Sequence, residues 1–425
     1  MPIQDAFSGG HKDTIRPFQA MTTESYRFIL IMVYSLCKWT ETFPVRNDTD
    51  ALDDSFHTIF RTTHMACIEL EDLWRNISTH TSKSLLKKHL SEEKYINLKK
   101  LSTKYGTTLA DVIRSGCKNL DSKVGVYACD PEGYTVFKDL LDPIICDFHR
   151  VKEVNHPKCD YGDLTNLKFR ELDEAGDFII STRVRIGRCH KGFPFPPLLT
   201  NVQRKEMEVM TVKALDTLEG DLKGAYHSLE TMPRNEYQKL VDDHIMFRDD
   251  NHTLSDAGGY DGWPVGRGVY LNNNRTFIVW VNEGDHLRFI SMEKGSDLSS
   301  VYKRLIFALQ QVEMKVEFAY DNKRGFLSNC PSNLGTCLRA SVHLKMPKLE
   351  RYKEMLNEIC DRNNLQLRGV NGEHTESAEA VYDVSNKRRL GLTEYQAVCE
   401  MYNGVEELIK TEQQLEENNG IFMFD

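Results

Sequence analysis

The chain lacks an excess of positive charge, a long hydrophobic run, and a cysteine pattern that would bind a metal or build a disulfide framework. Its 425 residues carry a formal net charge of -9, which argues against a nucleic-acid-binding surface. Its 11 cysteines show no paired C-x-x-C spacing, so we expect free thiols, no protein-bound metal and a cytoplasmic location. At this length, a content of 40% hydrophobic and 28% charged residues favours two domains.

One stretch, Phe28 to Cys37, looks membrane-like, but it is too short to span a bilayer, so we expect no membrane association. It would resemble a signal sequence only if translation began at Met21, and then its flank is barely basic and no small-residue cleavage site follows. We therefore expect a buried helix there. Residues 1–62 as a whole are interpreted as an extension, partly helical, of unknown role.

Two common nucleotide-binding loops are also missing. The sequence contains no G-x-x-x-x-G-K-[ST] P-loop and no glycine-rich loop of the protein-kinase type. If the chain binds a nucleotide, arginine side chains must neutralise the phosphates instead. Their fixed charge and forked donors suit that task.

From about residue 63 to 150, apolar side chains recur at helical spacing, which predicts a small all-helical domain. The apolar faces are Leu85, Leu86 and Leu90; Leu109, Val112 and Ile113; and Phe137, Leu140 and Leu141, where Pro143 should end the helix. Residues 151–176 contain a proline, a glycine and several charges, and we interpret them as a linker.

The pattern changes in residues 177–425. Alternation of period two predicts strands at Asp177–Ile186, Thr276–Asn282 and His286–Met292, and helical periodicity appears at Glu206–Leu218 and Leu298–Val312. This mixture predicts an α+β domain with an antiparallel sheet flanked by helices.

Residues 329–343 place a thiol, a proline turn and an arginine close together. Arg339, Ser341 and His343 alternate with apolar residues, which predicts a strand with one polar face. Cys330 precedes it in the run Cys330-Pro331-Ser332. A buried structural cysteine before an edge strand would be the plainer interpretation.

This stretch closely resembles the signature of the phosphagen (guanidino) kinases, and ordered matches run from about Ser82 to about Lys410. Within the family, the sequence of these motifs is most similar to that of the arginine kinases. The resemblance implies a larger domain with an eight-stranded antiparallel sheet. It also implies reversible transfer of the γ-phosphoryl group from Mg-ATP to a guanidino acceptor, arginine first, with Mg²⁺ held mainly by the nucleotide. We expect a monomer.

The resemblance also implies the nucleotide site. Arg183 and Arg185 are two residues apart, so both should project from one face of a strand. An isolated arginine on a strand is usually a solvated surface residue, but here each candidate matches an arginine that binds the nucleotide phosphates in the family. The implied nucleotide-binding residues are Ser181, Thr182, Arg183, Val184, Arg185, His244, Arg288, Arg339, Ala340, Ser341, Val342, His343, Arg368, Gly369, Val370, Asn371, Gly372, Glu373 and Asp383.

On the acceptor side, the resemblance implies catalytic roles for Glu373, Cys330 and Arg339. A carboxylate can orient a guanidinium and take its proton, and a thiolate can help to hold it. Ser332 and the clustered arginines should lower the pKa of the thiol. The acceptor loop of the family matches Ser122, Lys123, Val124, Gly125, Val126 and Tyr127, which on the bare sequence would be a plain helix connection.

The chain departs from the family at two positions. Gly284, in Asn282-Glu283-Gly284-Asp285, replaces a glutamate that contacts the acceptor in the family, and the adjacent Glu283 should face the other way if this segment is a strand. Lys123 replaces a usual glycine of arginine kinases. Two alternatives follow: another guanidino acceptor, such as taurocyamine, or a member that binds nucleotide but turns over slowly.

Overall fold

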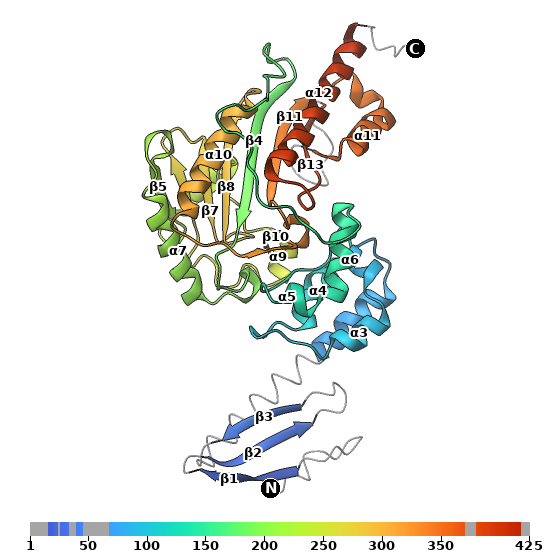
Figure 1. Cartoon of the computed structure of the whole chain (residues 1–425), viewed down its shortest axis with the longest axis vertical. Helices are drawn as coiled ribbons and strands as arrows, with labels where there is room; N and C mark the ends of the chain where they lie inside the picture. Colours follow the sequence, from blue (N-terminus) through green and yellow to red (C-terminus); the bar gives the residue numbers. More distant parts are fainter. Residues whose placement is uncertain (1–15, 24–25, 34–39, 46–67, 370–379, 418–425) are drawn as a thin grey trace.

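A short antiparallel sheet lies in the N-terminal part of the chain (Figure 1). The computed structural model describes residues 68–369 and 380–417 in full, together with the backbone of β1 (Arg16–Thr23), β2 (Tyr26–Val33) and β3 (Thr40–Val45), which pair in that order. The expectation of a helix from Phe28 is therefore wrong for Phe28 to Val33. An apolar run this short does not distinguish strand from helix, and its aromatic and β-branched residues favour a strand.

A helical domain follows, as predicted. Residues 68–79 are helical, and the later helices are α2 (Leu85–His89), α3 (Glu92–Leu98), α4 (Leu109–Lys118), α5 (Gly133–Val136) and α6 (Lys138–His149). A capping box between Thr108 and Asp111 begins α4. Helix α6 continues past Pro143, contrary to expectation, because burial of Ile144 and Ile145 outweighs the single hydrogen bond that proline removes.

The larger domain is built on an eight-stranded sheet in which every neighbouring pair is antiparallel, as predicted. Across the sheet the strands are β12 (Leu365–Gly369), β13 (Val381–Asn386), β11 (Leu338–Lys345), β4 (Ile179–Arg188), β8 (Leu287–Lys294), β7 (Phe277–Val281), β6 (Gly268–Asn272) and β5 (Gly224–Ser228). Residues 151–178 connect the two domains without a helix or strand.

Two long helices cover one face of this sheet. Helix α10 (Leu298–Glu313) packs on β4 and β8, and α12 (Glu394–Glu417) packs on β11 and β13 (Figure 1). The remaining helices of the domain are α7 (Asn201–Leu215), α8 (Arg234–Asp242), α9 (His252–Asp256) and α11 (Lys353–Arg362). The main apolar core fills the layer between sheet and helices, so alternate strand residues are left for the opposite face.

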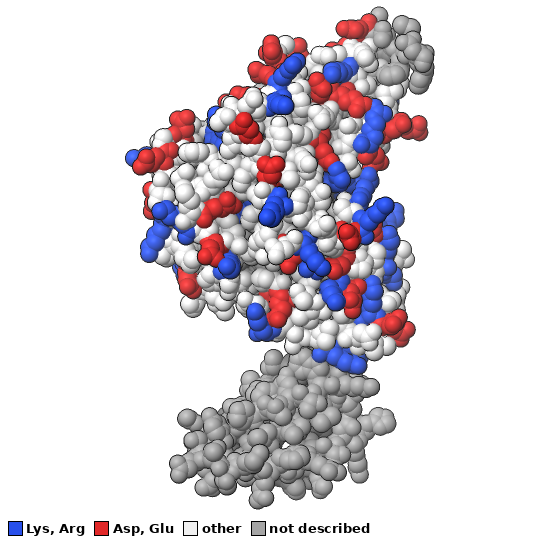
Figure 2. Space-filling model, in the orientation of Figure 1, with Lys and Arg blue, Asp and Glu red and all other residues white. Residues whose placement is uncertain are grey.

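The outer surface carries no dominant charge of one sign on the side shown in Figure 2, where lysine and arginine side chains are interspersed with aspartate and glutamate. No helix among the described residues is long and apolar enough to cross a membrane. Every cysteine in the described part of the chain is a free thiol.

Four buried histidines predict how stability depends on pH. Burial lowers the pKa of His149 to about 3 and that of His156 and His190 to about 4, and holds that of His286 well below its usual value. The unfolded chain binds these protons more readily, so the stabilisation is complete above pH 6.5 and is lost as pH falls toward 4. Each imidazole contributes a slope of about 1.4 kcal/mol per pH unit in this window.

We therefore expect a lower urea midpoint at pH 5.0 than at pH 7.5, measured by circular dichroism. Replacing one of these histidines by an uncharged residue, as in His156→Gln, should make the dependence shallower. Equal midpoints at the two pH values would show that the imidazoles are not neutral in the folded protein.

Candidate active site

Antiparallel pairing brings the predicted arginines to one face of the sheet. Arg185 of β4 lies directly opposite Arg339 of β11, and Arg288 of β8 lies opposite Gly187, two residues further along β4. Directly paired residues, and residues two apart on a strand, project from the same face. Arg183 shares this face because it is two residues from Arg185. We call this surface the arginine face.

The strands beyond β11 extend the arginine face. His343 pairs with both Ser181 and Asp383, and Asp383 pairs in turn with Arg368 of β12. The Ser181 hydroxyl and Nδ1 of His343 lie 3.1 Å apart. The predicted residues are spread over more than 180 residues of sequence, yet they come together on five adjoining strands, β12, β13, β11, β4 and β8.

The side chains between these positions do not join the site. Thr182, Val184, Ala340 and Val342 are buried on the helix-covered side of the sheet. Ser341 is opposite Arg183 and belongs to the arginine face. The implied nucleotide contacts of the four alternate residues are not side-chain contacts in this arrangement.

The arginine face concentrates like charge. Burial lowers the pKa of Arg183 to about 10, with a further contribution from the neighbouring Arg339. Burial, together with Arg288 and Arg339, holds the pKa of Arg185 well below its usual value. These shifts mean that the guanidinium groups are both desolvated and mutually repelled, so an anion placed among them would relieve the repulsion.

Carboxylates neutralise only part of this charge. Arg339 forms an ion pair of 2.8 Å with Asp383, and Arg288 lies 2.6 Å from Glu283 and 3.5 Å from Asp285. Burial disfavours the charge of Arg288, but the two carboxylates outweigh it and raise its pKa. Arg185 makes no hydrogen bond or ion pair with any residue that the structure describes.

Some buried donors on the arginine face lack a hydrogen-bond partner. Within the described residues, Nε and Nη2 of Arg183 and Nε of Arg339 are buried without a hydrogen-bond partner. The guanidinium groups of Arg183 and Arg288 lie 5.7 and 5.8 Å from the ring centre of Trp280, which supports them from the side. A buried unsatisfied donor is costly, and phosphate oxygens are acceptors that would satisfy several at once.

The structure describes His244 and Gly369 among the remaining predicted nucleotide-binding residues. His244 is exposed, has a φ of 57°, and its charge contributes to lowering the pKa of His343, behind burial and other groups. Gly369 ends β12. The predicted residues Val370, Asn371, Gly372 and Glu373 lie outside the described residues.

The predicted acceptor loop, Ser122–Tyr127, belongs to the helical domain. The carbonyls of Lys123 and Val124 accept hydrogen bonds from the amides of Leu85 and Leu86, at 2.9 and 3.0 Å. The Lys123 side chain is exposed and helps to lower the pKa of Lys387 in the larger domain, behind burial and Arg150. The loop therefore lies where the two domains meet.

Gly125 is required by the packing of this loop. Its φ of 81° is unfavourable for other residues, and a Cβ atom there would lie 2.9 Å from the Cβ of Leu86. Tyr127 ends the loop, and its hydroxyl lies 3.4 Å from the Thr253 hydroxyl of α9. The end of the acceptor loop is thus in contact with the catalytic domain.

Cys330 immediately precedes the 3-10 helix η4 (Pro331–Asn333), and its Sγ atom lies 3.0 Å from the Ser332 hydroxyl. Burial raises the pKa of the Cys330 thiol, while the side chain and backbone of Ser332 lower it. The expectation that clustered arginines lower this pKa below its usual value is wrong, because burial is the larger effect. One arginine, Arg389, does act on the thiol in the expected direction.

Arg389 is a functional candidate that the sequence analysis missed. Its Nη1 donates to the Ser332 carbonyl at 2.6 Å, and its Nε donates to the Leu338 carbonyl at 3.2 Å. It lies in the run Lys387-Arg388-Arg389, which is typical of solvated surface charge, yet Arg389 is only 5% exposed. Only its burial beside the thiol loop distinguishes it from its neighbours.

Gly284 lies in the turn between β7 and β8, and not in a strand. The expectation that Glu283 faces away from the site is therefore wrong, since strand alternation does not apply there and Glu283 pairs with Arg288. A Cβ at position 284 would meet Nη2 of Arg288 at 3.4 Å and Cδ2 of Leu254 at 3.6 Å, which are ordinary contacts. A side chain at this position would fit and would project toward Arg288.

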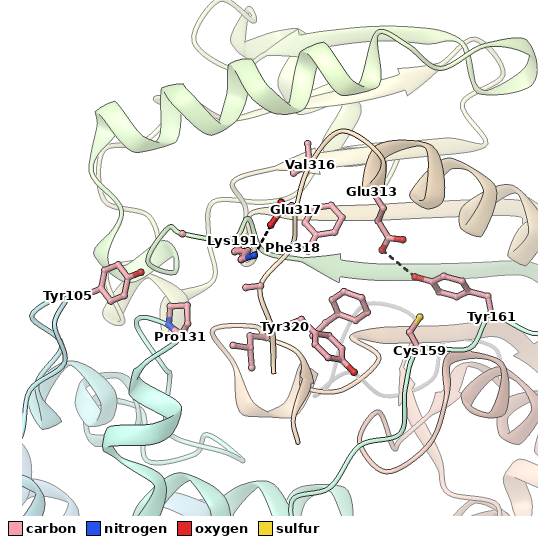
Figure 3. A pocket seen from close by; sticks show the side chains of 14 residues that line it. Tyr105, Pro131, Cys159, Tyr161, Lys191, Glu313, Val316, Glu317, Phe318 and Tyr320 are labelled. Atoms are coloured by element: carbon pink, nitrogen blue, oxygen red, sulfur yellow. Dashed lines mark hydrogen bonds and ion pairs between the residues drawn. The ribbon is translucent and has the colours of Figure 1, made fainter. Parts of the chain in front are cut away.

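A cavity of about 630 Å³ lies elsewhere, between the interdomain linker, the end of α10 and the rim of the helical domain (Figure 3). There the Tyr161 hydroxyl donates to Glu313 at 3.3 Å, and Lys191 pairs with Glu317 at 2.7 Å. None of the predicted site residues lines this cavity, so it is not the candidate active site. Groups of side chains able to hold a metal ion do not occur among the residues described.

Comparisons with known proteins identify the family. A family model described as ATP:guanido phosphotransferase, C-terminal catalytic domain, matches residues 206–415, and the N-terminal domain of the same family matches residues 80–146. An arginine kinase of Liolophura japonica is 56% identical over 345 residues, which cover 81% of this chain and 99% of that protein. An arginine kinase of Eriocheir sinensis is 50% identical over 351 residues, covering 82% of this chain and 98% of that protein.

Solved structures are similar as well. The substrate-free duplicated taurocyamine kinase from Schistosoma mansoni has a TM-score of 0.78 at 43% identity, over 82% of this chain and 50% of that chain. A crystal structure of lombricine kinase has a TM-score of 0.73 at 34% identity, over 79% of this chain and 94% of that chain. Because family models match both domains and a relative is covered almost from end to end, the chain belongs to the ATP:guanido phosphotransferase family, the phosphagen kinases.

Proposed function

We propose that this phosphagen kinase transfers the γ-phosphoryl group of Mg-ATP reversibly to L-arginine and so forms a phosphagen that buffers ATP. The observation that carries the proposal is the arginine face, which has buried donors without partners and whose Arg288 lies near Asp285, the carboxylate that accepts from Ser328 of the thiol loop. Several relatives that match this chain over nearly their whole length are arginine kinases, which supports arginine as the acceptor. Free thiols among the described cysteines support a cytoplasmic location.

On the nucleotide side, we assign the phosphates to Arg183, Arg185, Arg288, Arg339 and Arg368. Phosphoryl transfer requires in-line placement and stabilisation of charge on the moving group more than covalent help from the protein. Guanidinium groups fixed on a sheet supply both without reorganisation during the reaction. Mg²⁺ would enter on the nucleotide and offset phosphate charge, since the residues described offer it no cluster of ligands.

On the acceptor side, Cys330 and Glu373 would place the acceptor guanidinium. A carboxylate at Glu373 would orient the group and take its proton, and a Cys330 thiolate would hold it by charge. The acceptor loop Ser122–Tyr127 would cover the rest of the acceptor. The contact of Tyr127 with α9, and the hydrogen bond from Ala128, directly after the loop, to the Asn329 carbonyl, support this placement.

Two alternatives remain tied to particular residues. Lys123 adds an exposed cation at the acceptor loop and favours an acceptor with an anionic end, such as taurocyamine. Gly284 removes a family carboxylate and favours a member that binds nucleotide but turns over slowly. The arginine face is common to all three readings, so only acceptor turnover separates them.

An acceptor panel tests the proposal. Purified protein with Mg-ATP should phosphorylate L-arginine with a higher kcat/KM than taurocyamine, lombricine or creatine, measured by coupled release of ADP. A preference for taurocyamine would contradict arginine as the acceptor. Mg-ADP should raise the melting temperature by mass action in every case, and its failure to do so at millimolar concentration would contradict the nucleotide site itself.

Restoring the missing carboxylate should accelerate the reaction. Gly284→Glu should raise kcat on the best acceptor by roughly tenfold, equivalent to about 1.4 kcal/mol of transition-state stabilisation, because a second carboxylate would orient the guanidinium. Gly284→Gln is the matched control, with similar size and no charge, and should not accelerate. A double-mutant cycle with Glu373→Gln should be non-additive, since both groups act on one substrate. An unchanged or lower kcat in Gly284→Glu would show that Glu283, Asp285 and Arg288 have taken up this space.

Cys330 should be the first cysteine alkylated at neutral pH. Burial raises the pKa of both thiols, but Ser332 and Arg389 counter this effect at Cys330, whereas the pKa of the more exposed Cys159 is raised to about 12. Peptide mapping after brief iodoacetamide treatment should show this order, and Mg-ADP with arginine should protect Cys330. Cys159→Ser should leave the labelling of Cys330 unchanged, and faster labelling of Cys159 in the natural protein would contradict the assignment.

A further inference from the structure

The loop that carries Cys330 is held by the other domain. Three hydrogen bonds run from the helical domain to consecutive or near-consecutive carbonyls of this loop. They join the Tyr134 hydroxyl to the Ser328 carbonyl (2.6 Å), the Ala128 amide to the Asn329 carbonyl (2.7 Å), and Nε2 of His149 to the Pro331 carbonyl (3.0 Å). Since carbonyls only accept, Tyr134, Ala128 and His149 are the donors.

The catalytic domain holds the remaining carbonyls of the same loop. The Cys330 carbonyl accepts from the Asn333 amide at 2.9 Å, and the Ser332 carbonyl accepts from Arg389 at 2.6 Å. Every carbonyl from Ser328 to Ser332 is therefore directed by a specific donor. The path of the backbone on both sides of the thiol is fixed by two domains together.

The two side-chain donors are suited to a permanent role. Tyr134 and His149 are 1% and 0% exposed. Burial lowers the pKa of His149 to about 3, so its imidazole is neutral at working pH, and the bond to Pro331 requires the proton on Nε2. Each side chain bonds to a carbonyl of the thiol loop, and neither has a part in the phosphoryl-transfer chemistry assigned above.

We propose that Tyr134 and His149 are positioning residues for the Cys330 thiolate. By drawing the carbonyls of Ser328 and Pro331 toward the helical domain, they keep the negative ends of these dipoles away from Sγ. The thiol then contacts the Ser332 hydroxyl, and the other charges that act on it are those of Arg389 and Asp285. Freed carbonyls could rotate toward the thiolate and disfavour its charge.

The same bonds connect acceptor recognition to the thiol. Ala128, the middle donor, directly follows Tyr127, the last residue of the acceptor loop. A shift of the acceptor loop is therefore transmitted to Asn329, the residue before Cys330. The inference that acceptor turnover depends on these bonds rests on the proposed catalytic role of Cys330. The inference that the bonds position the thiol does not depend on that role.

Conservative variants test the inference. Tyr134→Phe removes one donor without changing shape, and Tyr270→Phe is its matched control, because the buried Tyr270 hydroxyl donates to the Leu222 carbonyl at 3.0 Å in another part of the sheet domain. His149→Leu removes the second donor, and His149→Gln can restore it, because the amide nitrogen of glutamine lies near the position of Nε2. Each protein is assayed for the pH profile of Cys330 alkylation and for kcat and KM of both substrates.

We expect Tyr134→Phe and His149→Leu to move the alkylation profile of Cys330 to higher pH and to lower kcat about five- to tenfold, the usual effect of one lost hydrogen bond at a site. The KM for Mg-ATP should stay within twofold of the natural value. His149→Gln should recover most of the loss, and Tyr270→Phe should behave as the natural protein.

An unchanged alkylation profile in both Tyr134→Phe and His149→Leu would overturn the inference. Equal losses in His149→Gln and His149→Leu, or in Tyr270→Phe and Tyr134→Phe, would also overturn it, because the effect would then be general destabilisation. A shifted profile with unchanged kcat would support the positioning of the thiol and contradict the catalytic role of Cys330 in the proposed function.

Discussion

Repulsion among guanidinium groups that are partly or fully buried is the constraint that the larger domain must satisfy. Antiparallel register places Arg183, Arg185, Arg288 and Arg339 on one face, where burial and mutual repulsion depress the pKa of Arg183 and Arg185. The opposite face offsets this cost by burying a continuous apolar core under α10 and α12. The sheet therefore holds several cations close together with only part of their charge paired.

The acceptor side is built differently, from pieces of both domains. The acceptor loop comes from the helical domain, the thiol loop comes from the larger domain, and hydrogen bonds from Ala128, Tyr134 and His149 connect them. With the proposed phosphate site on one domain and the proposed acceptor site divided between two, the acceptor could change while the nucleotide chemistry is kept. The similar solved structures include a taurocyamine kinase and a lombricine kinase, which fits this division.

The turn between β7 and β8 shows how local geometry alters the meaning of a substitution. Gly284 removes a carboxylate, but Glu283 and Asp285 on either side of it both lie near Arg288. Negative charge is therefore still present next to position 284, although both carboxylates are directed at Arg288, which we assign to the nucleotide. These carboxylates become available to the acceptor guanidinium only if Arg288 exchanges its bonds with them for bonds to phosphate.

The sequence by itself determined the periodic elements: the alternating strand around Arg183 and Arg185, the polar face of Arg339, Ser341 and His343, and the helical faces of the first domain. It also supplied the motifs from which the family resemblance follows. Period and local chemistry are encoded residue by residue, so they can be read without partners. The same property explains the failures at short or interrupted patterns, where Phe28 to Val33 forms a strand and Pro143 is tolerated inside α6.

Only the tertiary structure decided which strands pair and in what register, and hence that Arg185 faces Arg339 and that Asp383 joins Arg368. It also decided that burial raises the pKa of the Cys330 thiol, and that Arg389, Tyr134 and His149 hold the thiol loop. In the sequence these residues are an ordinary cation, an aromatic and a histidine. Their roles arise from burial and from contacts between residues 57 to 194 positions apart, and neither leaves a periodic pattern in the sequence.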